Sequence, residues 1–384
     1  MKILITGGAG FIGSNLSLQL ISLGHEVTVL DSLSPQIHGV DPKNTSPLFR
    51  SISGKVKFIE GSVCDVSSWR EALLEQEAVV HLAAETGTGQ SMYEVSRYVD
   101  VNIGGTGIFL NFIANEPHTV RKVVIASSRA IYGEGKYHSK ALGLVYPKVR
   151  NDTDMRVGKF DPLCPATGEP LELLATDEDS VIHPTSVYGI TKQTQEQLVM
   201  SVCGSLGIGA TALRYQNVYG PGQSLSNPYT GILSIFSTRI LNRNPINIFE
   251  DGKESRDFIY ITDVVEATCL ALFKDVANGE VFGIGSGVPT TVLQVAHGLI
   301  KQYEIDVPVE VTGAYRLGDI RHNFADLTKA KSLLGFQPKV SFSKGLQTFA
   351  SWVMQQAIQV DGYDSSVKEM EQRGLMKQAG KISD

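Results

Sequence analysis

Cysteine is scarce in this chain of 384 residues, and none of its four cysteines forms a CxxC pair. The four lie far apart in the sequence, so we interpret them as packing residues rather than as disulfide partners. No spacing of histidine and cysteine fits a zinc site, and we therefore expect no bound metal. These absences argue against a disulfide scaffold and against a structural metal centre. The cysteines are Cys64, Cys164, Cys203 and Cys269.

Positive charge and long apolar runs are also limited. Lysine and arginine total 34 and aspartate and glutamate 40, which gives a net charge of −6. An acidic chain lacks the basic field that nucleic-acid and anionic-membrane binding usually need. No segment reaches the roughly 18 consecutive apolar residues of a membrane span. The apolar run at the N-terminus ends at Thr6, too early for a signal peptide. We expect a cytoplasmic protein with no nucleic-acid or membrane partner.

The sequence contains instead an alternation of short β-branched runs and segments of helical period. This alternation is typical of a parallel sheet covered by helices on both faces, which binds ligands at the carboxyl ends of its strands. We therefore predict an α/β, Rossmann-type doubly wound parallel sheet with a smaller C-terminal substrate-binding lobe. The predicted strands are 2–6, 26–30, 56–60, 78–82, 121–126 and 208–214, and the predicted helices 11–23, 92–116 and 185–206.

We expect three regions along the chain. Residues 1–214 form the Rossmann domain, and 215–356 form mainly the second lobe, with some segments returning to the first domain. Residues 357–384 are expected to be a solvated, partly helical tail. Residues 133–182 show no sustained period. An ordered loop of that length is usually a lid or a binding element, and a mobile surface insertion is the alternative.

A glycine-rich loop follows the first predicted strand. Gly7, Gly10 and Gly13 are spaced three apart and precede a helix. Their missing side chains allow a tight turn and the close approach of a pyrophosphate, which the N-terminus of the helix would attract. Asp31 ends the second strand, where its carboxylate can accept ribose hydroxyls and would repel a 2′-phosphate. The loop, with Phe11 and Ile12, therefore predicts dinucleotide binding. Asp31 predicts that the dinucleotide is NAD rather than NADP.

Asp65 and Val66 follow the third predicted strand. An acid and an apolar residue at a strand end suit the amino group and the ring face of adenine. A solvated turn carboxylate explains Asp65 almost equally well, so both interpretations stay open.

A tyrosine and a lysine begin the helix predicted at 185–206. Tyr188 and Lys192 are four residues apart, so they share one helix face. A neighbouring ammonium lowers the pKa of a phenol, which makes it a useful base. Ser127 and Ser128 end the strand predicted at 121–126, at the ligand-binding edge of the same sheet. The combination predicts an acid–base site beside the dinucleotide.

The motifs together resemble those of extended short-chain dehydrogenase/reductases, in the branch of nucleotide-sugar epimerases and dehydratases. The resemblance covers roughly residues 1–356 and implies a tightly held NAD, a nucleotide-diphosphate-sugar substrate and a homodimer formed through two helices per subunit. The motifs are GGAGFIG at 7–13, HLAA at 81–84, VN at 101–102, SSRAIYG at 127–133, YGITK at 188–192, RYQNVYGPGQ at 214–223, SRDFIYITDV at 255–264 and GDIRHNFAD at 318–326.

The resemblance also implies roles for individual residues. Tyr188 would be the base, Lys192 its partner and a ligand of the nicotinamide ribose, and Ser128 the partner of the substrate hydroxyl. Leu82, Ala83, Ala84 and Asn102 would belong to the cofactor site and its supporting network. Thr86 and Arg129 would contact the sugar end, while Asn217, Arg256 and Arg321 would hold the diphosphate.

The residues after Ser128 bear on the reaction. Related dehydratases and decarboxylases carry an acid there, whereas this chain has Arg129 and Ala130. Without a second acid, the expected reaction is 4-epimerisation, in which a transient 4-keto sugar receives its hydride back on the opposite face. The closest resemblance is to a subgroup acting on dTDP-L-rhamnose, and a UDP-hexose is the other expected substrate. The alternatives are a dehydratase, a decarboxylase or a net oxidoreductase, and, of another class, a non-catalytic NAD-sensing protein. We also expect residues 133–182 to cover the sugar pocket.

Overall fold

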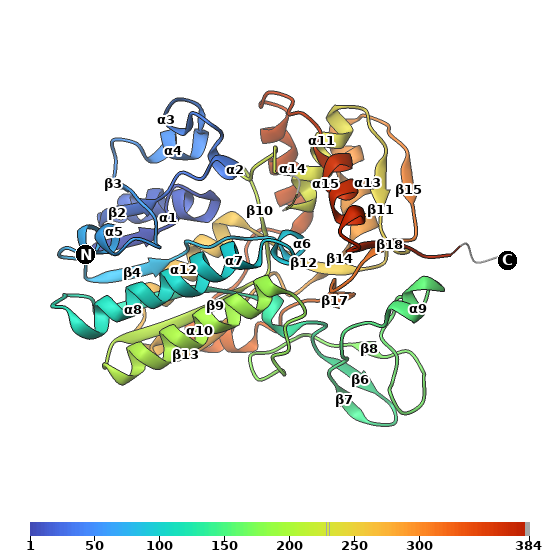
Figure 1. The fold of residues 1–384 in the computed structure, drawn as a ribbon, viewed down its shortest axis with the longest axis horizontal. Coiled ribbons are helices and arrows are strands. Elements are labelled where there is room, and N and C mark those ends of the chain that lie inside the picture. The colour runs from blue at the N-terminus through green and yellow to red at the C-terminus, as the bar shows by residue number, and fades with distance from the viewer. Residues whose placement is uncertain (228, 230, 381–384) are drawn as a thin grey trace.

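A computed structural model describes residues 1–227, 229 and 231–380, and its main feature is a seven-stranded parallel sheet (Figure 1). The strand order is β13-β9-β5-β4-β1-β2-β3, and every pair is parallel. The predicted Rossmann-type sheet is therefore confirmed. The strands are β1 (Lys2–Thr6), β2 (Glu26–Asp31), β3 (Lys57–Glu60), β4 (Ala78–His81), β5 (Lys122–Ser128), β9 (Gly209–Tyr215) and β13 (Glu280–Ile284).

Helices cover both faces of this sheet, which explains why its strands are almost continuously apolar. Successive residues of β1 show the two faces, because Ile3 and Ile5 belong to one buried cluster and Leu4 to the other. One face packs against α1 (Phe11–Ser22) and α12 (Ile261–Phe273), the other against α5 (Val66–Ala72), α8 (Gly105–Asn115) and α10 (Val187–Ser205).

The helix predicted at 92–116 is interrupted by a π-helical turn. It consists of α7 (Val95–Tyr98), η1 (Val99–Gly104) and α8 in direct succession. The turn carries the fully buried Asn102, whose Oδ1 accepts the Glu85 N–H at 2.8 Å. Its Nδ2 donates to the Thr191 hydroxyl of α10 at 2.9 Å. Asn102 therefore ties the loop after β4 to the helix that carries Tyr188.

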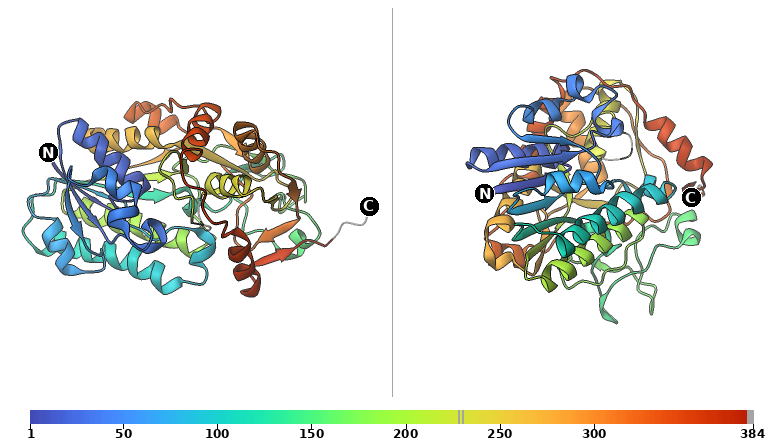
Figure 2. Two further views of the ribbon diagram at one scale, coloured as in Figure 1. Left: turned by 90° about the horizontal axis from the view of Figure 1, so that it is seen from above. Right: turned by 60° about the vertical axis from the view of Figure 1, so that its left-hand side comes forward.

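The second lobe lies beyond the carboxyl ends of the Rossmann strands, as Figures 1 and 2 show. β12 (Ser255–Tyr260) pairs with β10 (Asn217–Tyr219), β14 (Pro289–Thr291) and β17 (His322–Asn323), and β11 (Ile246–Ile248) pairs with β15 (Val309–Val311). α12 and β13 return from this part of the chain to the first domain. The helices of the lobe are α11 (Ile232–Leu241), α13 (Val292–Tyr303) and α14 (Phe342–Val353).

Residues 133–182 form an ordered insertion rather than an irregular loop. β6 (Tyr137–Ser139) pairs with β7 (Gly143–Val145) and β8 (Glu172–Leu173), and α9 (Asp152–Arg156) follows β7. The Arg150 guanidinium ion-pairs with Glu134 at 3.1 Å and with Glu250 of the second lobe at 2.7 Å. The insertion is thus tied to the second lobe by buried charges.

The C-terminal segment is partly helical, as expected, but it is not a solvated tail. α15 (Tyr363–Gln372) buries Tyr363, Ser366 and Met370. β18 (Met376–Gln378) then pairs with β16 (Ala314–Arg316) in an antiparallel ladder. The sequence prediction was wrong here because three buried side chains in a polar segment leave little apolar periodicity.

The remaining short elements are α2 (Pro35–His38), α3 (Pro42–Thr45), α4 (Pro47–Ile52), α6 (Thr88–Ser91), η2 (Arg129–Tyr132), η3 (Asp275–Ala277) and η4 (Ala330–Leu334).

None of the helices in the described ranges is both long and apolar enough to cross a lipid bilayer.

Candidate active site

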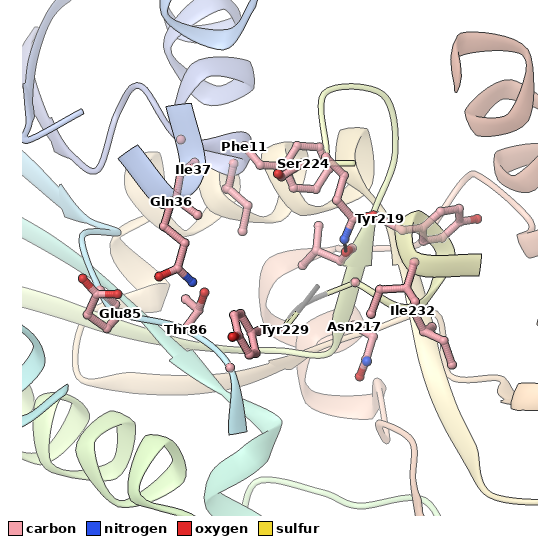
Figure 3. Close-up of a pocket in the computed structure, with 18 of the residues that line it drawn as sticks. Phe11, Gln36, Ile37, Glu85, Thr86, Asn217, Tyr219, Ser224, Tyr229 and Ile232 are labelled. Carbon is pink, nitrogen blue, oxygen red and sulfur yellow. Dashed lines mark hydrogen bonds between the residues drawn. The ribbon is translucent and has the colours of Figure 1, made fainter. Parts of the chain in front are cut away.

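A cavity of about 1070 Å³ extends from the glycine-rich loop, along the carboxyl ends of the Rossmann strands, into the second lobe. Figure 3 shows side chains entering it from well-separated segments, among them Gln36, Thr86, Asn217 and Tyr229. The cavity therefore lies at the edge of the sheet where the sequence places the functional residues, between the two lobes.

The glycine-rich loop leaves no room for side chains. A Cβ on Gly13 would lie 2.3 Å from the Gly7 carbonyl oxygen, and one on Gly7 would lie 2.8 Å from the Ala83 nitrogen. Gly7 also has a φ of +68°, which a residue with a side chain rarely adopts. The backbone of this loop is thus open towards the cavity and close to the loop after β4, as dinucleotide binding requires.

Asp31 borders the same end of the cavity. Its carboxylate accepts the Ala9 N–H at 3.0 Å and the Leu33 N–H at 2.9 Å, which fixes it beside the glycine-rich loop. Burial raises the pKa of this carboxyl, and the two backbone N–H groups and the charge of His38 counteract the rise. Gly7, Gly10, Phe11, Ile12, Gly13, Leu82, Ala83 and Ala84 also line the cavity, so the residues present fit NAD.

His38 is a neighbour of Asp31 that no sequence motif indicates. Its Nε2 lies 3.9 Å from Asp31 Oδ1, and its Nδ1 lies 2.9 Å from the Ser46 hydroxyl. Burial lowers the pKa of this imidazole, which favours its neutral form. His38 lies on α2, a helix of four residues, which is too short to show a periodicity that would have indicated His38 as a site residue.

Ser128, Tyr188 and Lys192 all line the cavity. Ser128 ends β5, and the other two lie one turn apart at the start of α10, which Ser186 caps by accepting the Gly189 N–H at 3.1 Å. Burial raises the pKa of the Tyr188 phenol, whereas a hydrogen bond with Ser128 and the charge of Arg129 lower it. The structure therefore brings the predicted residues together on one cavity, and the cation whose charge lowers the pKa of the phenol is Arg129.

Lys192 is 3% exposed, and its Nζ donates to Gln195 Oε1 at 2.7 Å. Burial lowers the pKa of this amine to about 7, so it is only partly charged at neutral pH. The sequence predicts Lys192 as the cation that lowers the pKa of Tyr188, whereas in the structure the charge that does so is that of Arg129.

Ser127 and Ser128 have different surroundings. The Ser127 hydroxyl donates to Glu196 Oε2 at 2.5 Å, and Glu196 also pairs with the buried Arg214 at 2.6 Å. Ser127 is therefore committed to a structural network, which leaves Ser128 as the hydroxyl beside Tyr188.

Two guanidinium groups in the cavity have no carboxylate partner within 4.0 Å among the described residues. Arg129 donates to Asn217 Oδ1 at 3.1 Å. Arg256 donates to the backbone carbonyls of Ile320 at 2.7 Å and Arg321 at 2.9 Å. Burial and the charge of Arg256 lower the pKa of Arg129 to about 9. Since unpaired charges are costly away from water, this region suits an anionic ligand.

The structure corrects the expected role of Arg321. This side chain is fully buried, does not line the cavity, and ion-pairs with Asp161 of the insertion at 2.7 Å and with Glu250 at 2.9 Å. Arg316, five residues earlier, lines the cavity instead and pairs with Asp319 at 2.8 Å. Arg321 lies in the motif at 318–326 and Arg316 lies just before it. The sequence does not show which of the two lines the cavity, because that depends on the fold.

Asp65, Val66 and Asn102 also lie outside the cavity lining. Asp65 and Val66 are exposed at the start of α5, and the cavity is bordered there by Ser62 and Val63. The strand ends at Glu60, as predicted, and the four residues that follow it carry Asp65 away from the cavity. Asn102 acts through Glu85 and Thr191, as described above, and so supports the site without lining it.

Residues 133–182 do not line the cavity, so the expectation that they cover the sugar pocket is wrong. Arg150 of the insertion donates instead to the Asp319 carbonyl at 2.9 Å, behind the loop that carries Arg316.

Several residues that line the cavity belong to no motif that the sequence alone would indicate. They include Asn247, Phe249, Glu254, Tyr363 and Met370.

A doubly wound sheet, a dinucleotide loop and a serine–tyrosine–lysine set on one cavity define the class of short-chain dehydrogenase/reductases. The model of the NAD dependent epimerase/dehydratase family matches residues 3–149 and 164–285. The chain belongs to this family, and it is an NAD-dependent enzyme.

Curated relatives align along most of the chain. A dTDP-L-rhamnose 4-epimerase from Burkholderia thailandensis is 36% identical over 362 residues, covering 92% of this chain and 95% of the relative. A UDP-N-acetyl-alpha-D-glucosaminuronate decarboxylase from Bacillus cytotoxicus is 29% identical over 356 residues, covering 91% and 97%.

Solved structures show the same fold. A UDP-glucose 4-epimerase from Thermotoga maritima, determined with UDP-glucose, has 33% identity and a TM-score of 0.71, covering 92% of this chain and 99% of that chain. A UDP-glucuronic acid 4-epimerase from Bacillus cereus, in complex with UDP-glucuronic acid and NAD, has 26% identity and a TM-score of 0.73, with the same coverage.

Proposed function

We propose that the protein is an NAD-dependent 4-epimerase of nucleotide-diphosphate sugars. The observation that carries the proposal is the shared cavity, which is lined by Ser128, Tyr188 and Lys192 together with the dinucleotide loop and with Arg129 and Arg256, two guanidiniums without a carboxylate partner among the described residues. A sugar nucleotide has its reacting hydroxyl on the sugar and two negative charges on the adjoining diphosphate. The cavity offers an acid–base group and cations in this arrangement.

NAD supplies a hydride acceptor that can return the hydride to the sugar carbon. Tyr188 takes the proton of the sugar 4-hydroxyl, and Ser128 holds the oxygen of that hydroxyl. Arg129 favours the phenolate of Tyr188, because a nearby cation stabilises the negative charge. After the keto sugar turns its other face, Tyr188 gives the proton back. Arg256 and Arg316 hold the diphosphate during this turn, with Asn217 beside them.

Arg129 also bears on the alternative reactions. Elimination or decarboxylation needs a further acid or base beside the keto sugar, and the two residues after Ser128 are Arg129 and Ala130. Epimerisation needs none beyond Tyr188. A non-catalytic NAD-sensing protein would not need a phenol flanked by a serine hydroxyl and a guanidinium that both counteract the rise of its pKa on burial.

The substrate favoured by the relatives is dTDP-L-rhamnose, since the B. thailandensis relative is named for it. A UDP-hexose is the second candidate, because the T. maritima structure holds UDP-glucose. We also propose a cytoplasmic homodimer formed through the helices α7 to α8 and α10. Val95, Val99 and Ile190 on these helices are 44%, 38% and 48% exposed, and such an interface would cover them.

The test is incubation of the purified protein with dTDP-L-rhamnose, UDP-glucose and UDP-glucuronic acid, followed by proton NMR of the sugar stereocentres. We expect inversion at C4 of one substrate, with unchanged mass and no added NAD. Loss of water or carbon dioxide, or a requirement for stoichiometric NAD, would replace epimerisation by one of the alternative reactions.

A further inference from the structure

The C-terminal strap, residues 357–380, crosses from one lobe to the other beside the cavity. On the side of the second lobe, Arg239 ion-pairs with Asp361 at 3.2 Å and with Asp364 at 2.9 Å. Arg239 is 3% exposed, so the strap is held by a buried cation. The ladder between β18 and β16 fixes its far end next to Arg316.

The strap also contacts the Rossmann domain. The Arg373 guanidinium lies 4.1 Å from the ring centroid of Tyr93. A Cβ on Gly89 would lie 3.5 Å from the Met370 sulfur, which places α15 against α6. The Tyr229 hydroxyl, from a segment that lines the cavity, donates to Glu369 at 2.7 Å. The strap is therefore part of the cavity wall rather than an appendage of one lobe.

Tyr363 is the aromatic side chain that the strap adds to this wall. It is 8% exposed and lines the cavity. Its ring lies 6.4 Å from that of Phe249, at an interplanar angle of 26°. Its phenol oxygen is buried and has no hydrogen-bond partner among the residues that the structure describes. Buried polar atoms are normally paired, so this hydroxyl requires an explanation.

The neighbours of Tyr363 indicate which part of a ligand it meets. The Arg316 guanidinium lies 5.5 Å from the centroid of Phe249, so the two aromatic rings adjoin a cation of the proposed diphosphate site. Glu254 lines the same cavity, and its Oε2 is a second buried oxygen without a hydrogen-bond partner in the described part of the chain. The Arg239 guanidinium lies 4.5 Å from the centroid of the Tyr363 ring, and Glu254 Oε2 lies 3.7 Å from the Arg321 guanidinium. A pair of aromatic side chains between cations, with a phenol oxygen that lacks a hydrogen-bond partner, suits a planar heterocycle with polar edges.

We propose that Tyr363 binds the nucleoside of the sugar nucleotide, with Phe249 as the neighbouring aromatic wall, so that the C-terminal strap completes the substrate site. This inference rests on the proposed function. A nucleotide-diphosphate sugar with its sugar at Tyr188 and its diphosphate at Arg256 and Arg316 must place its nucleoside beyond these two arginines. The Phe249 ring adjoins Arg316, and the Tyr363 ring adjoins Phe249, so both are within reach of a nucleoside held there.

The test measures binding of dTDP, UDP and inorganic pyrophosphate to the full-length, NAD-loaded protein by calorimetry. Tyr363→Phe removes one hydrogen-bonding oxygen, and we expect it to raise the Kd of the preferred nucleoside diphosphate about three- to tenfold. Tyr363→Leu, which also removes the ring, should raise it further. Pyrophosphate should bind both variants as it binds the wild type. The matched control is Tyr303→Phe, since the Tyr303 hydroxyl bonds to Ser237 at 2.7 Å, away from the cavity.

The outcomes separate this inference from the proposed function. If the wild type binds a nucleoside diphosphate and both Tyr363 variants bind it equally well, the role of Tyr363 is overturned while the proposed function stands. Equal weakening of pyrophosphate binding would also overturn it, because the effect would then act on the phosphates. If the wild type binds neither dTDP nor UDP, the proposed function itself fails, and the inference fails with it.

Discussion

At the scale of the residue, the site depends on how a few charges are placed around one phenol. Burial opposes the ionisation of Tyr188, whereas Ser128 and Arg129 favour it. Lys192, which the sequence alone identifies as the activating cation, lies in the same buried region with a pKa of about 7. The helical spacing predicts that Tyr188 and Lys192 share a face, but the degree of burial comes from packing that no short motif contains.

Tyr188→Phe removes the proposed base and keeps the ring. We expect kcat to fall by about 10²–10⁴-fold, the usual contribution of general acid–base catalysis, while NAD remains bound. Turnover with the identified sugar nucleotide and the NAD content of the purified variant are the measurements. Turnover near that of the wild type would remove Tyr188 from the mechanism.

Arg256→Ala removes a cation proposed to hold the diphosphate in both the ground and the transition state. We expect KM to rise about tenfold or more with little change in kcat, because uniform binding is lost. Arg243→Ala, on an exposed residue outside the cavity, is the control. A large fall in kcat at unchanged KM would give Arg256 a role in the chemical step instead.

At the scale of the element, the insertion at 133–182 supports the site from behind. Arg150 is one of its links to the second lobe, with Glu134 and Glu250 as partners whose side chains are 1% and 5% exposed. Arg150 also donates to the Asp319 carbonyl at 2.9 Å, in the loop that carries Arg316. The lack of hydrophobic period in this segment reflects a fold stabilised by ion pairs and by a small cluster of Met155, Phe160 and Tyr315.

Arg150→Met leaves the buried carboxylate of Glu134 without its cation and removes one of the two cations that pair with Glu250, which keeps Arg321. We expect the free energy of unfolding to fall by about 3–5 kcal/mol, the usual cost of breaking a buried ion pair. Urea denaturation measures it. The control is Arg156→Met, whose pair with Asp152 is mostly exposed and should contribute less than about 1 kcal/mol. Equal effects of the two substitutions would contradict the supporting role of the insertion.

At the scale of the whole molecule, the buried Lys192 links stability to pH. Its pKa is lowered from 10.5 to about 7 in the folded state, so the unfolded chain binds more protons between these two values. Stability should therefore rise with pH in this window as the buried amine loses its charge, and Lys192 should add no pH dependence below about pH 7.

Lys192→Met tests this dependence. In cofactor-free protein, the stability of the wild type relative to the variant should increase between pH 7 and pH 9.5, as measured by urea denaturation at each pH. A difference that stays constant over this range would show that Lys192 keeps its charge in the folded protein.

The sequence by itself determined the Rossmann sheet, the dinucleotide loop and the positions of Ser128, Tyr188 and Lys192. These features depend on local rules: apolar runs of strand length, glycines spaced for a turn, and side chains one helical turn apart. The tertiary structure decided that Arg316 rather than Arg321 lines the cavity, that the insertion lies behind the site, and that Tyr363 reaches it from the C-terminus. Those outcomes depend on which distant segments pack together, and burial and ion pairing between such segments leave no periodic signal in the chain.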